Sequence, residues 1–472
     1  MSQQNRTKMS VTQLTLLTAI NMIGSGIVML PTKLAEIGTI SILSWLITAV
    51  GSLCLAYAFA KCGMFSKRPG MGGYSEYAFG KAGNFMANYT YGVSLLFANI
   101  AIAITCVGYG AEFLEIELTP VQVCLSTIVV LWICTSANFM GASLTGKFSA
   151  LAVWCVILPV LLLTVIGWFW FSPTMYVEAW NPHNEPFFSA VGASISMTLW
   201  AFLGLESACA NSDAVDNPEK NVPIAVLAAT IGVAIIYIVS TNIIAGIVPN
   251  AELVKSNAPF GLTFTMMFNS TIGKIVTFLL VLSCAGSTLG WQFTIAKVFQ
   301  QSAIDGFFPK CFAKVNKWKA PVLGMIIITA IQTGFCFMTI SPELFKQFNR
   351  LVDLAVVTNI MPYLLSMAAV AVIMKVAKVE PSKAKLYNVI AIIGAIYSFY
   401  ALFSTGIKEV FYGSLATFLG WTLWGLIAPR FADTQINFLV AGVGFESFVE
   451  AENGIVGSLS DNIKNGFGHE IL

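Results

Sequence analysis

A carboxylate follows a long uncharged stretch near the middle of the chain. Glu206 comes directly after residues 186–205, which contain no Asp, Glu, Lys or Arg. A carboxylate at such a position in a membrane helix is costly unless it is paired or hydrated, so it marks a candidate functional site. A helix-end carboxylate that reaches water, or one neutralised by hydrogen bonds, is the structural alternative.

A Gly-Ser-Gly triplet interrupts the first apolar stretch. Gly24, Ser25 and Gly26 lie within residues 9–32 and are expected about midway along the membrane. Glycine weakens a helix by about 1 kcal/mol relative to alanine, so the helix would unwind here easily. Unwound backbone at membrane depth occurs only in a cavity or inside protein, and its N–H groups would suit an α-carboxylate. Close packing between helices is the alternative role of these small residues.

The chain is unusually poor in charge. Hydrophobic residues make up 57% and charged residues 10% of its 472 residues, against roughly 45–50% and 25% in soluble proteins. So few charges could not cover the surface of a soluble protein of this size. We therefore expect an all-α polytopic membrane protein in a lipid bilayer. The net charge of +2 does not indicate a nucleic-acid partner.

The gaps between charged residues predict twelve transmembrane helices. A membrane-spanning helix needs about 20 mainly apolar residues. The stretches of at least 20 residues without Asp, Glu, Lys or Arg are 9–32, 37–60, 82–111, 118–146, 148–177, 186–205, 221–251, 275–296, 320–342, 354–374, 386–407 and 410–429. Residues 256–273 narrowly miss this length, and their Asn, Pro and Gly residues predict a loop that lies outside the membrane or dips partly into it.

Lysine and arginine predict the orientation. With the N-terminus in the cytoplasm, the cytoplasmic segments hold 19 Lys and Arg residues and the extracellular segments hold 6. This bias follows the positive-inside rule, so both termini are expected in the cytoplasm. No cleavable signal peptide is evident. Residues 431–472 carry six carboxylates and one lysine and predict a mostly flexible cytoplasmic tail.

Metal, cofactor and catalytic chemistry are not expected. The two histidines, His183 and His469, are far apart, and the ten cysteines contain no CxxC pair. Disulfides and zinc sites are therefore not predicted. No phosphate-binding loop or histidine constellation supports an enzyme.

The two unusual spans are the first and the sixth of the twelve. They would occupy corresponding positions in an inverted five-helix repeat made of residues 9–177 and 186–374, with 386–429 appended and residues 1–430 forming the transporter domain. Discontinuous helices in corresponding positions indicate a transporter with its site near the membrane midplane. A channel or a membrane enzyme would not predict this correspondence.

Several runs resemble a known family. NMIGSGIVMLPTKLAEIGTIS (21–41), TLWAFLGLESACAN (198–211) and LGWQFTIAKVF (289–299) are similar to the basic amino acid/polyamine antiporter family of the amino acid–polyamine–organocation superfamily. The resemblance covers roughly residues 8–431. It is strongest, in runs such as 59–96, to members that handle putrescine and ornithine. It implies a leucine-transporter-like fold of twelve helices that works by alternating access in the bacterial cytoplasmic (inner) membrane.

The resemblance also implies an activity. Family members of this kind exchange extracellular ornithine for cytoplasmic putrescine, and proton-coupled putrescine uptake is a further mode. Functional coupling to a cytoplasmic ornithine decarboxylase would then serve acid resistance. Cadaverine/lysine or agmatine/arginine exchange is the alternative, because one methylene is worth only about 1–3 kcal/mol in a pocket. The oligomeric state stays open, with a homodimer as one possibility.

The resemblance assigns the central site residues. Gly24, Ser25 and Gly26 would hold the carboxylate and amino group of the substrate. Trp200 would close over the substrate, and Glu206 would belong to the cation- or proton-sensing path.

Further contacts are implied on other helices. Asn99 would be a polar substrate contact, and Trp291 would be an aromatic residue lining the site. Trp421 and Trp424 are further candidate faces for an ammonium group, an interaction of about 0.5–2 kcal/mol. A packing or interfacial role is the alternative for each tryptophan. A family member carries tyrosine at the position of Trp424, so a hydroxyl contact is not assured there.

Three residues near the predicted cytoplasmic face are candidates for a gate or vestibule. Glu76 is either a gate carboxylate or a solvated loop charge. Cys62 and Tyr91 lie at the cytoplasmic ends of the second and third spans and would line the inner vestibule. For Cys62 the alternative is a small apolar filler.

Overall fold

A computed structural model describes residues 10–23, 25–68, 70–206, 217–338, 340 and 344–431. These residues form helices, turns and short connections, and the described part of the chain contains no β-strand. Gly24 and residues 432–472 of the predicted tail lie outside the described residues.

The α-helices cover most of the described chain. In order they are α1 Val11–Met22, α2 Leu30–Ile37, α3 Ser41–Phe65, α4 Gly70–Leu114, α5 Pro120–Asn138, α6 Ala142–Ile166, α7 Pro173–Glu178, α8 Phe187–Gly192, α9 Ile195–Trp200, α10 Pro218–Ile247, α11 Asn250–Leu253, α12 Pro259–Met267, α13 Ser270–Ile304, α14 Val322–Met338, α15 Leu344–Val376, α16 Pro381–Ser404 and α17 Ile407–Ile427.

Each predicted span coincides with helical structure. The first falls on α1 and α2, the sixth on α8 and α9, and each of the others on a single longer helix. Among the described residues, nine helices are long and apolar enough to cross a membrane. The broken pairs and α14 fall outside this group because they are shorter. The helical, membrane-type architecture is therefore as predicted, whereas the twelve crossings and the inverted repeat stay predictions.

Local sequence explains where several helices begin. The Ser10 side chain accepts a hydrogen bond from the N–H of Gln13, whose own side chain accepts from the N–H of Ser10, a reciprocal cap at the start of α1. Thr119 and Gln122 form the same arrangement before α5, with Pro120 in the first turn. Such caps satisfy backbone donors that have no partner inside the helix.

The segment 256–273 is not a loop throughout, contrary to the prediction. It contains α12, which packs against the start of α13. Its glycines permit this contact, because a Cβ atom at Gly261 would collide with Thr277 and one at Gly273 with Thr265. The sequence pattern treats these glycines as turn signals. In the structure they allow α12 and α13 to pack closely.

Helix α4 is divided by Gly80. This residue has φ 62° and ψ −158°, a conformation that favours glycine because it lacks a Cβ atom. The kink separates residues 70–79 from the long part of α4, which begins where the predicted third span does. Glu76 therefore lies on a short helix and not in an extended loop.

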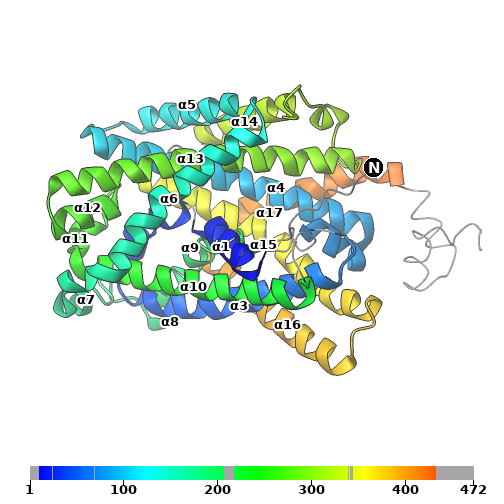
Figure 1. The fold of residues 1–472 in the computed structure, drawn as a ribbon, viewed down its shortest axis with the longest axis horizontal. Coiled ribbons are helices and arrows are strands. Elements are labelled where there is room, and N and C mark those ends of the chain that lie inside the picture. The colour runs from blue at the N-terminus through cyan, green and yellow to red at the C-terminus, as the bar shows by residue number, and fades with distance from the viewer. Residues whose placement is uncertain are drawn as a thin grey trace, which may run out of the picture.

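Parts of the two broken spans pack against the long helices of the bundle. α4 and α15 pack along each other, α13 packs on α4, and α10 packs on both α1 and α3. α9 contacts α3 and α15, and α1 and α9 appear near the middle of the molecule (Figure 1). The long helices thus pack against α1 and α9, the parts of the two interrupted spans that lie nearest the middle of this view.

Candidate functional site

The first helix is interrupted at the Gly-Ser-Gly triplet, as predicted. α1 ends at Met22, a 3-10 turn covers Ser25–Ile27, and α2 begins at Leu30. Gly24 and the side chain of Ser25 lie outside the described residues. Their contacts with a substrate therefore stay predictions.

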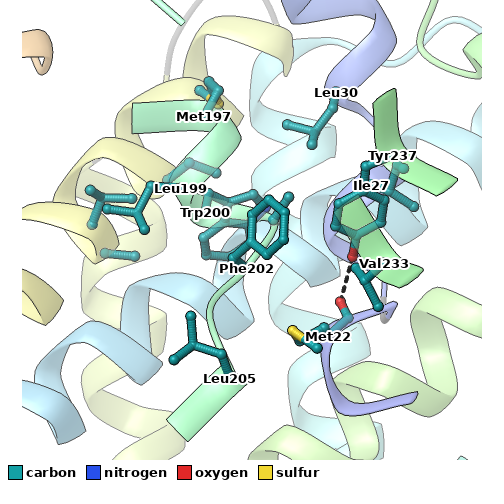
Figure 2. Packing of buried hydrophobic residues seen from close by; sticks show 14 of the residues in the cluster. Met22, Ile27, Leu30, Met197, Leu199, Trp200, Phe202, Leu205, Val233 and Tyr237 are labelled. Carbon is teal, nitrogen blue, oxygen red and sulfur yellow. Dashed lines mark hydrogen bonds between the residues drawn. The ribbon is translucent and has the colours of Figure 1, made fainter. Parts of the chain in front are cut away.

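Two buried tyrosines bind the carbonyl groups beside this interruption. The hydroxyl of Tyr237 on α10 donates to the carbonyl of Met22 at 2.7 Å, and that of Tyr109 on α4 donates to the carbonyl of Val28 at 2.9 Å. Figure 2 shows the first of these bonds. A buried polar group without a partner would cost about 1–3 kcal/mol. The surrounding helices therefore stabilise the break.

Trp200 connects the sixth span to the first. It ends α9, is 6% exposed, and its indole N–H donates to the carbonyl of Gly26 at 3.3 Å. A Cβ atom at Gly26 would lie 3.4 Å from the indole nitrogen. The sixth span is itself discontinuous, because α8 ends at Gly192 and turns follow at residues 201–204. The two predicted broken segments therefore meet at Trp200 (Figure 2).

Glu206 is buried and hydrogen-bonded by neutral groups. Its carboxylate accepts from the hydroxyl of Tyr91 at 3.0 Å, from the hydroxyl of Tyr363 at 2.7 Å, and from the N–H of Gly204 at 3.1 Å. It is 8% exposed. No ion pair within 4.0 Å is formed between Glu206 and any cationic side chain in the described part of the chain. The donors stabilise the carboxylate but carry no opposite charge.

Tyr363 was not indicated by the sequence pattern. It is fully buried on α15, and its ring packs edge-on against Phe59 at a centroid distance of 5.0 Å. In the sequence it follows Pro362 inside an otherwise apolar stretch. Tyr91 is half-buried, and its hydroxyl donates directly to Glu206. Its predicted place in the inner vestibule stays a prediction.

Asn99 belongs to a polar network between helices. Its side-chain N–H donates to Gln292 at 2.6 Å, and Gln292 donates in turn to Thr329 and Gln332, both at 2.7 Å. All four residues are buried. The network links α4 to α13 and α14, and none of these bonds reaches Trp200 or Glu206. The predicted substrate contact of Asn99 stays a prediction.

The remaining predicted residues lie in apolar surroundings. Cys62 is fully buried in the main apolar core, which favours the filler role. Trp291 is half-buried and packs against the apolar core. Trp424 packs on Phe85 at 5.5 Å between ring centroids, and Trp421 is 43% exposed. Among the described residues, the Trp424 ring contacts the rings of Phe85, Phe307 and Phe431, which supports its packing role.

Glu76 is buried in a charged cluster. Its carboxylate lies 2.8 Å from a guanidinium nitrogen of Arg68 and 2.7 Å from the ammonium nitrogen of Lys81, and it accepts a hydrogen bond from Asn84 at 2.6 Å. Its side chain is 1% exposed, so the solvated alternative is wrong. The ion pairs join residues on both sides of the kink at Gly80.

Replacing Glu76 with alanine is expected to reduce stability. The change leaves Arg68 and Lys81 without their carboxylate, and it should lower the free energy of unfolding by about 2 kcal/mol. This is less than the 3–5 kcal/mol of a fully buried pair because both cations are about a quarter exposed. Thermal unfolding of the purified protein in detergent measures the effect. Glu380→Ala, which removes an exposed pair with Lys383, is the control, and equal shifts in Tm would contradict the prediction.

Comparison with known proteins identifies the family to which this chain belongs. Residues 9–444 match the amino acid permease family. The chain belongs to that family. The permease is 67% identical over 432 residues to the putrescine transporter PotE of Escherichia coli (strain K12), which covers 91% of this chain and 98% of the relative. It is 64% identical over 425 residues to PotE of Haemophilus influenzae (90% and 98% covered).

A more distant relative handles another diamine. The permease is 30% identical over 353 residues to the cadaverine/lysine antiporter of Escherichia coli (strain K12), which covers 73% of this chain and 79% of the relative. Together with the family match, these similarities identify the permease as a membrane transporter and not an enzyme, as the sequence predicted.

Proposed function

We propose that the permease exchanges cytoplasmic putrescine for extracellular ornithine across the bacterial inner membrane by alternating access. The two relatives named as putrescine transporters support the diamine. The orientation with both termini in the cytoplasm follows from the distribution of Lys and Arg. The twelve spans and the repeats at 9–177 and 186–374 are part of the same proposal.

The surroundings of Glu206 carry the proposal. Its buried carboxylate has three neutral donors and no ion pair in the described part of the chain. An ammonium group would supply the missing positive charge, and a hydrogen bond to a charged group is worth about 1.5–3 kcal/mol. The nearby indole of Trp200 offers a face for the same cation. Both putrescine and ornithine present an ammonium group.

Alternating access would use the two interrupted segments as hinges. Trp200 is bonded to the backbone of Gly26, so movement of α9 relative to the first helix would break this contact. Tyr91 and Tyr363 bridge Glu206 to α4 and α15. Opening toward the cytoplasm would separate these groups, and the ammonium group would replace one hydroxyl as partner of the carboxylate.

Exchange has a physical basis if the loaded transporter reorients faster than the empty one. Each side must then be refilled before the transporter returns. Ornithine carries about +1 and putrescine about +2 at neutral pH, because amino groups near pKa 10 stay protonated. One cycle therefore moves one positive charge outward, against about 2.3 kcal/mol per 100 mV of inside-negative potential. Cytoplasmic decarboxylation of ornithine would maintain the required gradients.

Counterflow in proteoliposomes tests the proposal. Labelled ornithine is expected to accumulate in vesicles loaded with putrescine and not in empty vesicles. Lysine or agmatine inside should support little uptake. Equal uptake into empty vesicles would contradict exchange. Preferred exchange of cadaverine for lysine would replace the substrate pair with that of the 30% identical relative.

A further inference from the structure

A second carboxylate lies inside the bundle on α15. Asp353 is half-buried, and one of its carboxylate oxygens accepts a hydrogen bond from the hydroxyl of Ser196 on α9 at 2.9 Å. Ser196 is 3% exposed. No ion pair within 4.0 Å is formed by Asp353 among the residues that the structure describes. A carboxylate without an ion pair on a membrane helix is a candidate functional group.

Asp353 and Glu206 lie on opposite sides of Trp200. The chain runs from Ser196 through Trp200 to Glu206, and Figure 2 follows this segment from Met197 to Leu205. Ser196 binds Asp353 at one end, whereas Glu206 binds Tyr363 at the other. Both partners belong to α15, where they are ten residues apart, a rise of about 15 Å. The tryptophan therefore separates the two carboxylates along the bundle.

The electrostatic surroundings of Asp353 differ from those of Glu206. The positive charge of Lys33 on α2 and the negative charge of Glu409 on α17 both act on Asp353. Lys33 forms its own ion pair with Glu36 at 3.5 Å. With the orientation proposed above, this end of α15 faces the extracellular side. Asp353 itself forms no ion pair within 4.0 Å among the described residues.

We propose that Asp353 is an outer binding station for the ammonium group of an incoming substrate, on the extracellular side of Trp200. This inference rests on the proposed diamine transport. The two ammonium groups of an extended four-carbon diamine are only about 6 Å apart, which is less than the rise of about 15 Å along α15 between Asp353 and Tyr363, the residue that binds Glu206. One molecule therefore meets Asp353 and Glu206 in succession as Trp200 moves. Ser196 positions the outer carboxylate toward the same face of α9 as Trp200, since the two residues are four apart.

The KM for putrescine, measured separately on each side of the membrane, tests whether Asp353 binds the incoming substrate. Putrescine/putrescine exchange is measured with labelled putrescine in right-side-out and inside-out vesicles. Asp353→Asn is expected to raise the external KM about tenfold, equivalent to about 1.4 kcal/mol, and to leave the cytoplasmic KM unchanged. Asp353→Glu should restore most of the external affinity. Glu252→Gln, which neutralises an exposed carboxylate on α11, is the matched control and should leave both values unchanged.

A structural role for Asp353 would give a different result. An unchanged external KM in Asp353→Asn, or an equal rise on both sides, would overturn the proposal. These outcomes are distinct from failure of the proposed function, in which the parent protein itself would not exchange putrescine.

Discussion

Replacing Glu206 with glutamine is expected to lower the rate of putrescine exchange at low substrate concentration about 100-fold. Glutamine keeps the size of the side chain and can still accept a hydrogen bond from Tyr363, but it has no charge for an ammonium group. A charged hydrogen bond of about 3 kcal/mol corresponds to this factor. The amount of folded protein in the membrane should stay close to that of the parent, because three neutral donors hold this position.

Two further variants make this result specific. Glu115→Gln removes a carboxylate that is 68% exposed and paired with Lys274, and it should leave transport unchanged. Tyr363→Phe removes one donor to Glu206 and should have an intermediate effect of about fivefold, since a single hydrogen bond contributes about 1 kcal/mol. Normal kinetics in Glu206→Gln would show that this carboxylate has only a structural role.

Replacing Trp200 with leucine is expected to raise the KM for putrescine about 20-fold. Leucine has no aromatic face for the ammonium group, an interaction of up to about 2 kcal/mol when it is desolvated. It also has no N–H to bond the carbonyl of Gly26, which Trp200 reaches at 3.3 Å. Initial rates of putrescine exchange over a range of concentrations measure the change.

The phenylalanine variant separates the two contributions of Trp200. Trp200→Phe keeps a ring but no N–H donor, so we expect it to recover most of the affinity and not the bond to Gly26. Trp421→Leu is the control, because that indole is 43% exposed on α17. An identical loss in Trp200→Leu and Trp421→Leu would argue against a specific contact of Trp200 with the substrate.

The positions of the helices could be predicted because charge is so scarce. A membrane helix excludes charged residues from most of its length, so the gaps between them coincide with the helices. The break at Gly24–Gly26 was visible because glycine has the lowest helix propensity apart from proline. Glu206 could be identified as a candidate because a long uncharged stretch precedes it. These are local properties of the chain.

Contacts between distant segments could not be predicted in the same way. Tyr363 resembles any tyrosine in an apolar helix until the fold brings it to Glu206. The sequence pattern does not single out Asp353, because an uncharged stretch ends at every carboxylate and the predicted span begins one residue later, at 354. The burial of Glu76 depends on the kink at Gly80, which a local pattern does not reveal. Packing, and not propensity, determines these features.

Measuring substrate and charge movement together tests whether the permease exchanges putrescine for ornithine. Proteoliposomes are loaded with labelled putrescine, supplied with differently labelled ornithine outside, and held at a set potential with potassium and valinomycin. One ornithine is expected to enter for each putrescine that leaves, and exchange is expected to be faster when the interior is positive. Ornithine entry without putrescine exit, or a rate that does not depend on the potential, would contradict the proposed exchange.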